Sequence, residues 1–203
     1  MRAIVQDRYG PLEQVLAVED ADVPAPEAGE VRLDVRAASI HIGDCHGMRG
    51  VPYLMRPIFG LRRPKARIPG TDMAGVVEAV GSGVTAVEPS DEVFGWGVGA
   101  FAEQAIAPAD QLLPKPADLS FEQAAALGVS AATAVMAIRE VGEVRPGQQV
   151  LINGASGGVG SFAVQVAKSE GAEVTGVCSG RNVELVRSLG AEHVIDYTQD
   201  DFT

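Results

Sequence analysis

A glycine-rich stretch is the part of this sequence whose residue types and spacing point most directly to chemistry. It reads Gly154-Ala155-Ser156-Gly157-Gly158-Val159-Gly160 and fits the pattern G-x-G-x-x-G with Ala155 in place of the first glycine. Such a loop binds a dinucleotide pyrophosphate when it follows a strand and opens a helix. There Gly157 lets the backbone approach the phosphates, and Gly160 lets helix and strand pack closely. Residues 155–160 are therefore predicted to bind a dinucleotide cofactor, and a purely structural strand-to-helix turn is the alternative.

The residues that would distinguish NADH from NADPH lie about 20 residues further on, at the end of the next expected strand. NADH binding needs an Asp or Glu there, but the sequence has Cys178-Ser179-Gly180-Arg181 and no carboxylate. A hydroxyl and a guanidinium suit a 2′-phosphate, because arginine offers several fixed donors to phosphate oxygens. Ser179 and Arg181 therefore predict NADPH as the cofactor, and an Arg181 that is only solvated is the alternative.

The elements that must position this loop alternate between strands and helices. Strands are expected at residues 149–153, 173–178 and 193–196, and helices at 159–170 and 182–189. This alternation predicts a parallel, doubly wound α/β sheet. Before it, Ser120 and Gln123 form a capping-box pattern, which predicts the start of a helical and mostly buried alanine-rich segment that reaches residue 138.

The first half of the chain has a different pattern. Residues 31–35 alternate apolar and charged side chains, which is typical of a half-buried strand. Residues 75–84 and 92–96 continue with short strands between glycines and prolines, so a sandwich- or barrel-like β domain fits. We therefore expect two domains, a β domain over residues 1–118 and a dinucleotide-binding domain over residues 119–203.

The composition limits the partners of the protein. The chain has 203 residues and a net charge of −11, which disfavours binding to nucleic acid and to anionic membranes. Cys45 and Cys178 lack a disulfide or metal-ligand spacing and suit a reducing cytoplasm. One stretch departs from the acidic balance, because residues between Asp44 and Asp72 include six Arg and Lys and no carboxylate. A solvated basic loop and an anion-binding loop both fit that stretch.

Four segments of the chain occur in an order that is found in one known family. They are residues 37–44 (AASIHIGD), residues 69–75 (PGTDMAG), residues 91–95 (DEVFG) and the glycine loop. Together they resemble the medium-chain dehydrogenase/reductase superfamily, and within it the zinc-independent quinone oxidoreductases. The resemblance spans nearly the whole chain and implies a GroES-like β domain followed by a Rossmann domain.

The resemblance also bears on metal binding. The zinc alcohol dehydrogenases of this superfamily hold their catalytic zinc at positions that align here with His41, Thr71 and Val129, of which only His41 could bind a metal. A catalytic zinc normally needs three protein ligands. The family's structural zinc lobe needs four cysteines, and this chain has two. The resemblance therefore implies no metal, with an improvised site from His41, Cys45, His46 and Asp72 as the alternative.

Further residues match positions that have roles in that family. His41, Asp44 and Tyr53 lie in or just after the segment that lines the family's cleft, and they are the candidates for donating a proton or fixing the loop. His41 stands where Asn is common, so a proton donor and a structural histidine are both open. Thr133 matches a threonine near the nicotinamide and Tyr197 an aromatic residue beside the adenosine; helix packing and surface exposure are their alternatives.

These features predict an NADPH-dependent, zinc-free oxidoreductase that transfers hydride to a small-molecule substrate, a quinone or an α,β-unsaturated carbonyl. The alternatives are an alcohol dehydrogenase or ketone reductase on the same scaffold, and a non-catalytic NADPH-binding redox sensor. The family also implies a homodimer as one option. Only the first half of a doubly wound Rossmann sheet is present, so we expect a truncated form of a longer reductase. Its first strand, with residues 150–152, would then be an exposed apolar edge.

Overall fold

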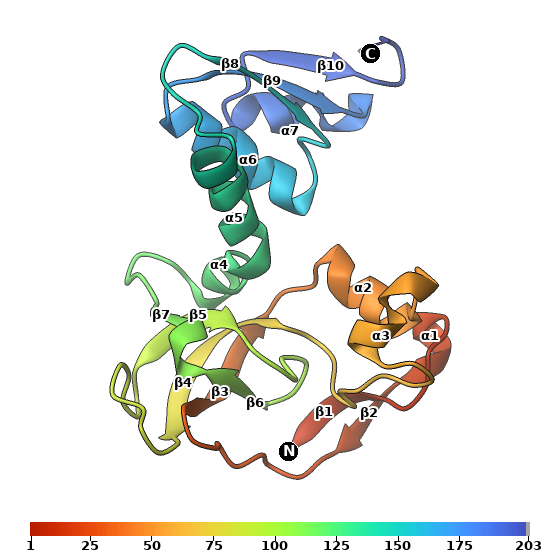
Figure 1. Ribbon diagram of the computed structural model, residues 1–203, viewed down its shortest axis with the longest axis vertical. Helices are drawn as coiled ribbons and strands as arrows, with labels where there is room; N and C mark the ends of the chain where they lie inside the picture. The colour runs from red at the N-terminus through yellow and green to blue at the C-terminus, as the bar shows by residue number, and fades with distance from the viewer. Residues whose placement is uncertain (202–203) are drawn as a thin grey trace. The chain divides into compact units, whose positions relative to one another are not determined.

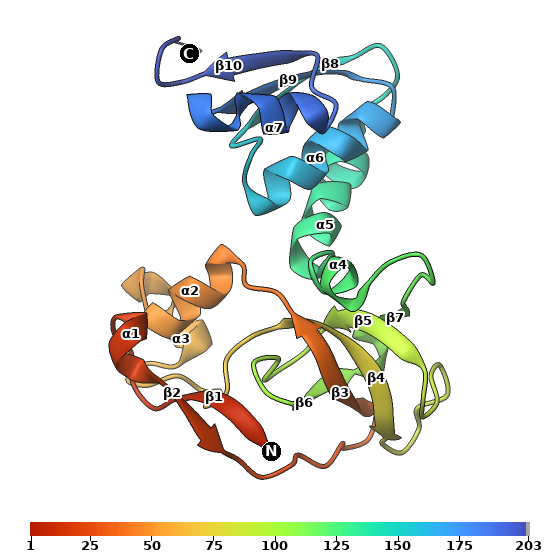
Figure 2. The same cartoon turned by 180° about the vertical axis from the view of Figure 1, so that it is seen from behind.

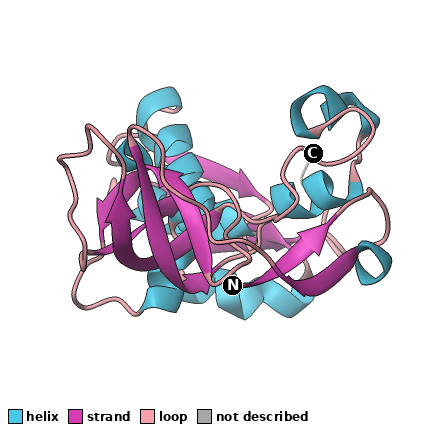
Figure 3. Cartoon of the chain, turned by 90° about the horizontal axis from the view of Figure 1, so that it is seen from below, coloured by secondary structure: helices cyan, strands magenta, loops and turns pink. Residues whose placement is uncertain are grey.

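The structure is a computed structural model that describes residues 1–201. The chain forms two compact units, and the boundary between them falls after Val129. The first unit consists of strands and short helices joined by loops, and the second alternates strands with helices (Figure 1). Figure 3 distinguishes the helices, strands and loops of the chain by colour. No helix within the described residues is long and apolar enough to cross a membrane.

The first unit contains two antiparallel sheets. Strands β1 and β2 form a two-stranded ribbon, and the larger sheet has five strands in the order β6-β3-β4-β5-β7. The strands are β1 (Arg2–Gln6), β2 (Leu16–Asp20), β3 (Glu30–Ala38), β4 (Asp72–Val80), β5 (Glu92–Trp96), β6 (Gln104–Pro108) and β7 (Leu112–Pro114). The predicted β domain is confirmed, although β4 begins and ends earlier than the expected range of 75–84.

Alternation along β3 places its apolar side chains in the core of this unit. Val31 and Leu33 are fully buried, and the charged residues that follow each of them are half buried. At Gly75 in β4 a Cβ would overlap the backbone of Asp34 in β3, so the close pairing of these two strands requires glycine. The start of β4 consequently lies beside the end of β3, which is where the candidate site begins.

Short helices and turns connect these strands. They are α1 (Leu12–Val15), α2 (Ile42–Arg49), η1 (Tyr53–Met55), α3 (Arg56–Phe59), η2 (Ala109–Gln111) and α4 (Phe121–Ala125). The predicted capping box at the start of α4 is confirmed. Ser120 Oγ accepts a hydrogen bond from Gln123 N (3.2 Å), and Gln123 Oε1 accepts one from Ser120 N (2.9 Å).

The alanine-rich segment after this cap differs from its prediction in two respects. It is not one helix, because α4 ends at Ala125, α5 (Gly128–Val135) starts anew, and a π-helical turn, η3 (Met136–Val141), follows. It is also not mostly buried. The buried residues are Ala124, Ala125, Ala134 and Ile138. Alanine favours a helix through its backbone propensity alone. An alanine-rich sequence therefore indicates a helix but does not determine how many of its residues are buried.

The second unit contains a parallel three-stranded sheet in the order β10-β9-β8. Its elements are β8 (Gln149–Asn153), α6 (Gly158–Ser169), β9 (Glu173–Cys178), η4 (Gly180–Asn182), α7 (Val183–Ser188) and β10 (His193–Asp196). All three predicted strands are confirmed with their boundaries, and the second helix begins as the 3₁₀ turn η4. α6 and α7 lie on the same face of the sheet, as Figures 1 and 2 both show.

The core of this unit lies between that face and the two helices. Val164 from α6, Val174 from β9 and Val186 from α7 are fully buried in one cluster. β8 forms an edge of the sheet and leaves Leu151 54% exposed, so the expected apolar edge is present. The unit is therefore the predicted first half of a Rossmann sheet, with its glycine loop between β8 and α6.

Candidate functional site

The glycine loop begins with two backbone hydrogen bonds that fix it to the neighbouring strand. Gly154 N and Ala155 N both donate to Val177 O in β9, at 3.1 and 3.0 Å. Gly154 has φ +75°, a conformation that favours glycine. Ala155 is fully buried against the sheet, because its Cβ lies close to Gly176. Gly154 and the first predicted cofactor-contacting residue, Ala155, thus hold the loop on the sheet through their backbone.

The end of the loop opens helix α6 with free donors. At Gly160 a Cβ would overlap the carbonyl of Gly154, so this close approach of helix and loop requires glycine. Ser161 N makes the first bond within the helix, to Gly157 O (2.9 Å). Helix geometry leaves the three preceding N–H groups, of Gly158, Val159 and Gly160, without an acceptor inside the helix. A phosphate is the kind of acceptor that such a turn binds.

Asn182 links the glycine loop to the end of β9, and no sequence pattern singles it out. Its Nδ2 donates to Ser156 Oγ (3.0 Å) and to Ser179 Oγ (3.3 Å). Because both hydroxyl oxygens accept from Asn182, both hydroxyl hydrogens are free to point elsewhere. The predicted residues Ser156 and Ser179 are thereby brought together, 23 positions apart in the sequence.

The loop after β9 is shaped by a carboxylate that belongs to β10. Thr198 donates to Asp196 Oδ1 from its hydroxyl (2.7 Å) and its N–H (3.0 Å), and these bonds hold the pKa of Asp196 below its ordinary value. A Cβ at Gly180 would lie 2.5 Å from Asp196 Oδ2, so the loop can pass this carboxylate only with glycine there. Asp196 thus sets the path of the backbone that carries the next residue, Arg181.

The other residues predicted for cofactor binding lie at three places in this unit. Arg181 is exposed in η4. Tyr197 is 54% exposed, and its N–H donates to Cys178 O (3.2 Å), which places it directly beside the end of β9. Thr133 lies half buried in α5. Arg181 and Tyr197 therefore share one end of the sheet with Ser179.

In the first unit, His41 forms the N-cap of helix α2. Its Nδ1 accepts a hydrogen bond from Gly43 N (3.0 Å), and Asp44 Oδ2 accepts one from His41 N (3.0 Å). These reciprocal bonds are a capping box, which satisfies backbone N–H groups that a helix otherwise leaves free. Both candidate residues of this segment, His41 and Asp44, therefore have a structural role at the start of α2.

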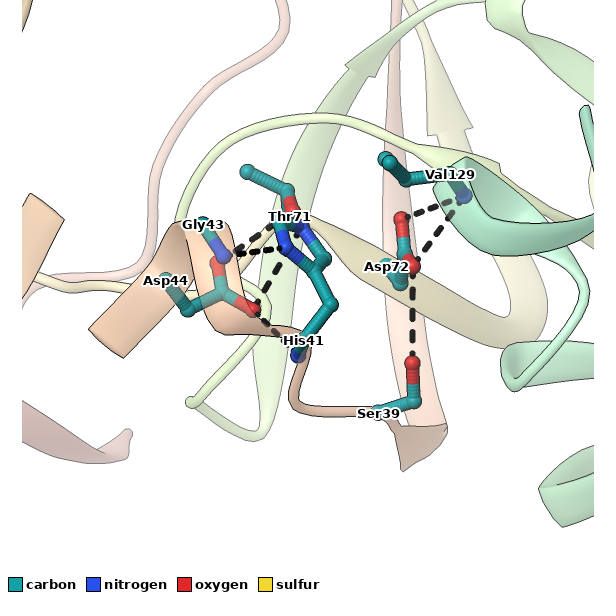
Figure 4. A network of polar contacts seen from close by, with 7 residues as sticks. All are labelled: Ser39, His41, Gly43, Asp44, Thr71, Asp72 and Val129. Atoms are coloured by element: carbon teal, nitrogen blue, oxygen red, sulfur yellow. Dashed lines mark hydrogen bonds and ion pairs between the residues drawn. The ribbon is translucent and has the colours of Figure 1, made fainter. Parts of the chain in front are cut away.

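A chain of side-chain hydrogen bonds runs from His41 to Asp44 through Thr71 (Figure 4). His41 Nε2 lies 2.9 Å from Thr71 Oγ1, and Thr71 Oγ1 donates to Asp44 Oδ1 (3.3 Å). Because Nδ1 is an acceptor from Gly43, the neutral imidazole carries its proton on Nε2 and donates it to Thr71. The tautomer of His41 is thus assigned by its partners. Sequence reasoning had no role for Thr71 except as a residue that cannot bind zinc.

Asp72, the neighbour of Thr71, is a second buried carboxylate. It is 1% exposed, and both its oxygens accept from Val129 N (3.1 Å each) at the start of α5. Ser39 Oγ lies 3.5 Å from Oδ2. A Cβ at Gly128 would lie 2.6 Å from Oδ1, so glycine is needed there. Burial raises the pKa of Asp72, and the hydrogen bond from Val129 partly opposes that shift.

A cavity of about 280 Å³ lies in this first unit, and the hydrogen-bonded residues His41, Thr71 and Asp44 form part of its wall. His41, Asp44 and Thr71 supply polar groups to it, and Lys65 contributes a charged one. Apolar side chains form much of the remaining lining: Met48, Ile58, Phe59, Ile68 and Val98. Such a cavity, apolar with a few convergent polar groups, is typical of small-molecule sites.

Tyr53 is not brought to this cavity. It is 71% exposed, and the Arg56 guanidinium lies 4.5 Å from its ring centroid and 4.8 Å from that of Tyr9. Tyr9 in turn donates its hydroxyl to Gly60 O (2.6 Å), and burial raises the pKa of that hydroxyl. Tyr53 therefore packs with Arg56, whereas His41 and Asp44 lie together.

The positions that align with zinc ligands form no metal-ligand set. Thr71 contributes a hydroxyl that is hydrogen-bonded to His41, and Val129 contributes its backbone N–H to Asp72. Within residues 1–201, no group of three or more His, Cys, Asp and Glu side chains is placed to hold a metal ion, so the alternative cluster around His41 is not formed.

Two family models match the chain. The model described as an alcohol dehydrogenase GroES-like domain matches residues 27–117, and the one described as a zinc-binding dehydrogenase matches residues 158–203. The first range lies in the β unit with the cavity. The second begins in the glycine loop and runs through α6, β9 and β10.

Similar proteins include several quinone oxidoreductases. A chloroplastic one from Triphysaria versicolor is 35% identical over 206 residues, which cover 97% of this chain and 61% of the relative. The structure from Coxiella burnetii has a TM-score of 0.86 at 32% identity and covers 100% of this chain and 64% of its own. The Escherichia coli enzyme, solved in complex with NADPH, has a TM-score of 0.87 at 29% identity, with 99% and 60% covered. The chain thus spans about three fifths of the length of these relatives.

The role of His41 as a helix cap can be tested by substitution. His41→Ala removes the acceptor for Gly43 N and is expected to lower the free energy of unfolding by about 1 kcal/mol. His41→Asn keeps a side-chain oxygen that can accept this bond and is expected to lose less than half as much. The measurement is urea unfolding followed by the fluorescence of Trp96, the single tryptophan, which lies in the same unit. Equal losses in the two variants would contradict the capping role.

The buried carboxylate of Asp72 predicts a pH dependence of stability. Its pKa is raised in the folded protein above the ordinary 3.8, so the folded state binds this proton more tightly than the unfolded state does. Stability contributed by this group is therefore lost as pH rises from about 4 through the raised pKa. Asp72→Asn removes the titration, so the stability of this variant relative to the wild type should increase as pH rises from about 4 through the raised pKa. Parallel urea-unfolding profiles of the two proteins over that range would refute the prediction.

Proposed function

The chain belongs to the medium-chain dehydrogenase/reductase superfamily, in its quinone oxidoreductase-like branch, and we propose that it transfers hydride from NADPH to a quinone or an α,β-unsaturated carbonyl. The observation that carries this proposal is the glycine loop, with its free N–H groups at the start of α6 and two serine hydroxyls held beside it. The E. coli relative whose structure contains NADPH supports the same cofactor.

The residues of the second unit fit NADPH. The N–H groups of Gly158, Val159 and Gly160 suit the pyrophosphate, and the close approach at Gly160 leaves no Cβ over the start of the helix. Ser156 and Ser179 can donate their hydroxyl hydrogens because Asn182 occupies their oxygens. Arg181 is exposed, and an arginine at this position suits the 2′-phosphate. Tyr197 beside the adenosine and Thr133 near the nicotinamide complete the proposed set.

NADPH supplies the hydride when it is bound, and the first unit must supply the substrate pocket and a proton. The cavity lined by Ile58 and Phe59 suits an apolar unsaturated body. At its wall, the Nε2–H of His41 donates a hydrogen bond to the Thr71 hydroxyl, which in turn donates one to Asp44. We assign the hydrogen bond to the substrate oxygen to the Nε2–H of His41, which donates to Thr71 here and would turn to the substrate when it binds. To Asp44 we assign the orientation of the Thr71 hydroxyl, which keeps donating to it. Tyr53 stays a third candidate for the proton on its place in the sequence, although it does not line this cavity.

The proposed chemistry does not use zinc. This is supported by Thr71 and Val129, which stand at the aligned ligand positions and offer no metal-binding side chain. The division into a substrate domain of residues 1–118 and a dinucleotide domain of residues 119–203 stays a proposal, as do a cytoplasmic location and a homodimer. A reducing compartment is supported by Cys45 and Cys178, which are both free thiols.

The reaction is tested by following NADPH oxidation with a panel of quinones, enones and simple ketones. Turnover with quinones or enones, in protein whose metal content is substoichiometric, is expected. Turnover that requires one equivalent of zinc, with ketones or alcohols as the better substrates, would favour the alcohol dehydrogenase alternative. Tight NADPH binding without turnover on the whole panel would favour the redox-sensor alternative.

The preference for NADPH is tested at Arg181. Arg181→Ala is expected to weaken NADPH binding about tenfold and NADH binding little, because a charge-assisted hydrogen bond to the 2′-phosphate is lost. Arg187→Ala is the matched control, since Arg187 is exposed in the following helix α7 and pairs with Glu184 (2.8 Å). Titration calorimetry measures both cofactors. Equal losses for NADPH and NADH in Arg181→Ala would show that Arg181 does not recognise the 2′-phosphate.

A further inference from the structure

The basic stretch of the first unit has no role in the function proposed so far. All 27 Asp and Glu residues of this acidic chain lie outside residues 45–71, which contain six of its 16 Lys and Arg. Arg67 is accounted for, because it pairs with Asp7 (2.9 Å) and Glu19 (2.7 Å). Of the remaining cations, Arg62, Arg63 and Lys65 form no ion pair with any carboxylate of the described residues.

The loop that carries these three cations is fixed at both ends. Lys65 N donates to Phe59 O (2.7 Å), which closes the loop, and Tyr9 holds it from outside through Gly60 O (2.6 Å). Gly60 has φ +127°, and a Cβ there would overlap the carbonyl of Arg63, so the tight turn requires glycine. The backbone of Lys65 is therefore held in one place by the fold.

That place is the wall of the cavity. Lys65 lines it together with Pro64 of the same loop and with Ile58 and Phe59 of α3, so a residue whose ammonium forms no ion pair stands in the same wall as apolar side chains. The other charged group in the wall is Asp44, which is 7% exposed and already accepts from His41 N and Thr71 Oγ1. An anion near Lys65 thus meets an unpaired cation, whereas the one carboxylate of the wall is satisfied by its own donors.

We propose that Lys65 is an anion subsite of this cavity and that the substrate is an apolar unsaturated carbonyl or quinone bearing a negatively charged group such as a carboxylate. As a statement about the substrate this rests on the proposed function. The apolar body lies against Ile58 and Phe59, and the anionic group pairs with Lys65 at the loop. Arg62 and Arg63 precede it in the same loop and add to the positive potential that attracts such a ligand.

The test measures binding without turnover, so that it is independent of the redox reaction. The probes are naphthalene-2-carboxylate and its neutral partner naphthalene-2-carboxamide, titrated calorimetrically into the 203-residue chain. The carboxylate is expected to bind about fivefold more tightly, as one partly exposed ion pair allows. Lys65→Gln should abolish this preference and leave carboxamide binding unchanged. In about 1 M NaCl, where the Debye length is about 3 Å, the preference should also disappear.

Arg49→Gln is the matched control, because Arg49 belongs to the same basic stretch and does not line the cavity. It should keep the full preference for the carboxylate. Equal affinities in the wild type, or a preference that survives Lys65→Gln, would overturn the proposal. If Lys65→Gln and Arg49→Gln lower the affinity for the carboxylate equally, and the chain also sediments with phosphatidylglycerol vesicles, the proposal would be overturned in favour of a lipid-binding surface. Carboxylate preference without any NADPH-dependent turnover would instead refute the proposed function and leave the subsite standing.

Discussion

A buried carboxylate must receive hydrogen bonds, and this requirement organises the first unit. Asp72 is 1% exposed at the start of β4, and an ionised group in such a place costs several kcal/mol unless donors reach it. The N–H of Val129, 57 residues away, donates to both carboxylate oxygens, and Gly128 leaves the space for that approach. The carboxylate therefore holds the beginning of α5 on the sheet of this unit, and it does so one residue from Thr71.

Because Thr71 and Asp72 are neighbours at the start of one strand, the same backbone fixes two networks. Thr71 contacts His41 and Asp44 at the N-terminus of α2, and Asp72 contacts the N-terminus of α5. The polar wall of the cavity thus depends on the pairing of β4 with β3, which sets where this backbone lies. The orientation of the His41 ring follows from its cap on Gly43 and needs no metal ligand.

In the second unit, backbone groups rather than buried side chains hold the candidate site in place. Two N–H groups of the glycine loop donate hydrogen bonds to Val177 O. The loop then leads into α6, whose first three N–H groups have no acceptor inside the helix. Side chains enter only at its border, where Asn182 joins Ser156 to Ser179. Alanine can stand in place of the first glycine of the pattern at Ala155 because its Cβ packs inward, whereas Gly160 has no room for a Cβ.

The sequence alone determined what depends on local backbone chemistry. The strands of the second unit, the loop 154–160, the capping box at Ser120 and the alternation in β3 follow from periodicities and turn residues that act over a few positions. Tertiary structure decided the contacts between distant residues: His41 with Thr71, Asp72 with Val129, and Asn182 with both serines. It also decided which alanines of the alanine-rich segment are buried and that Lys65 lines a cavity. These depend on strand register and loop closure, which bring together side chains whose spacing in the sequence carries no pattern.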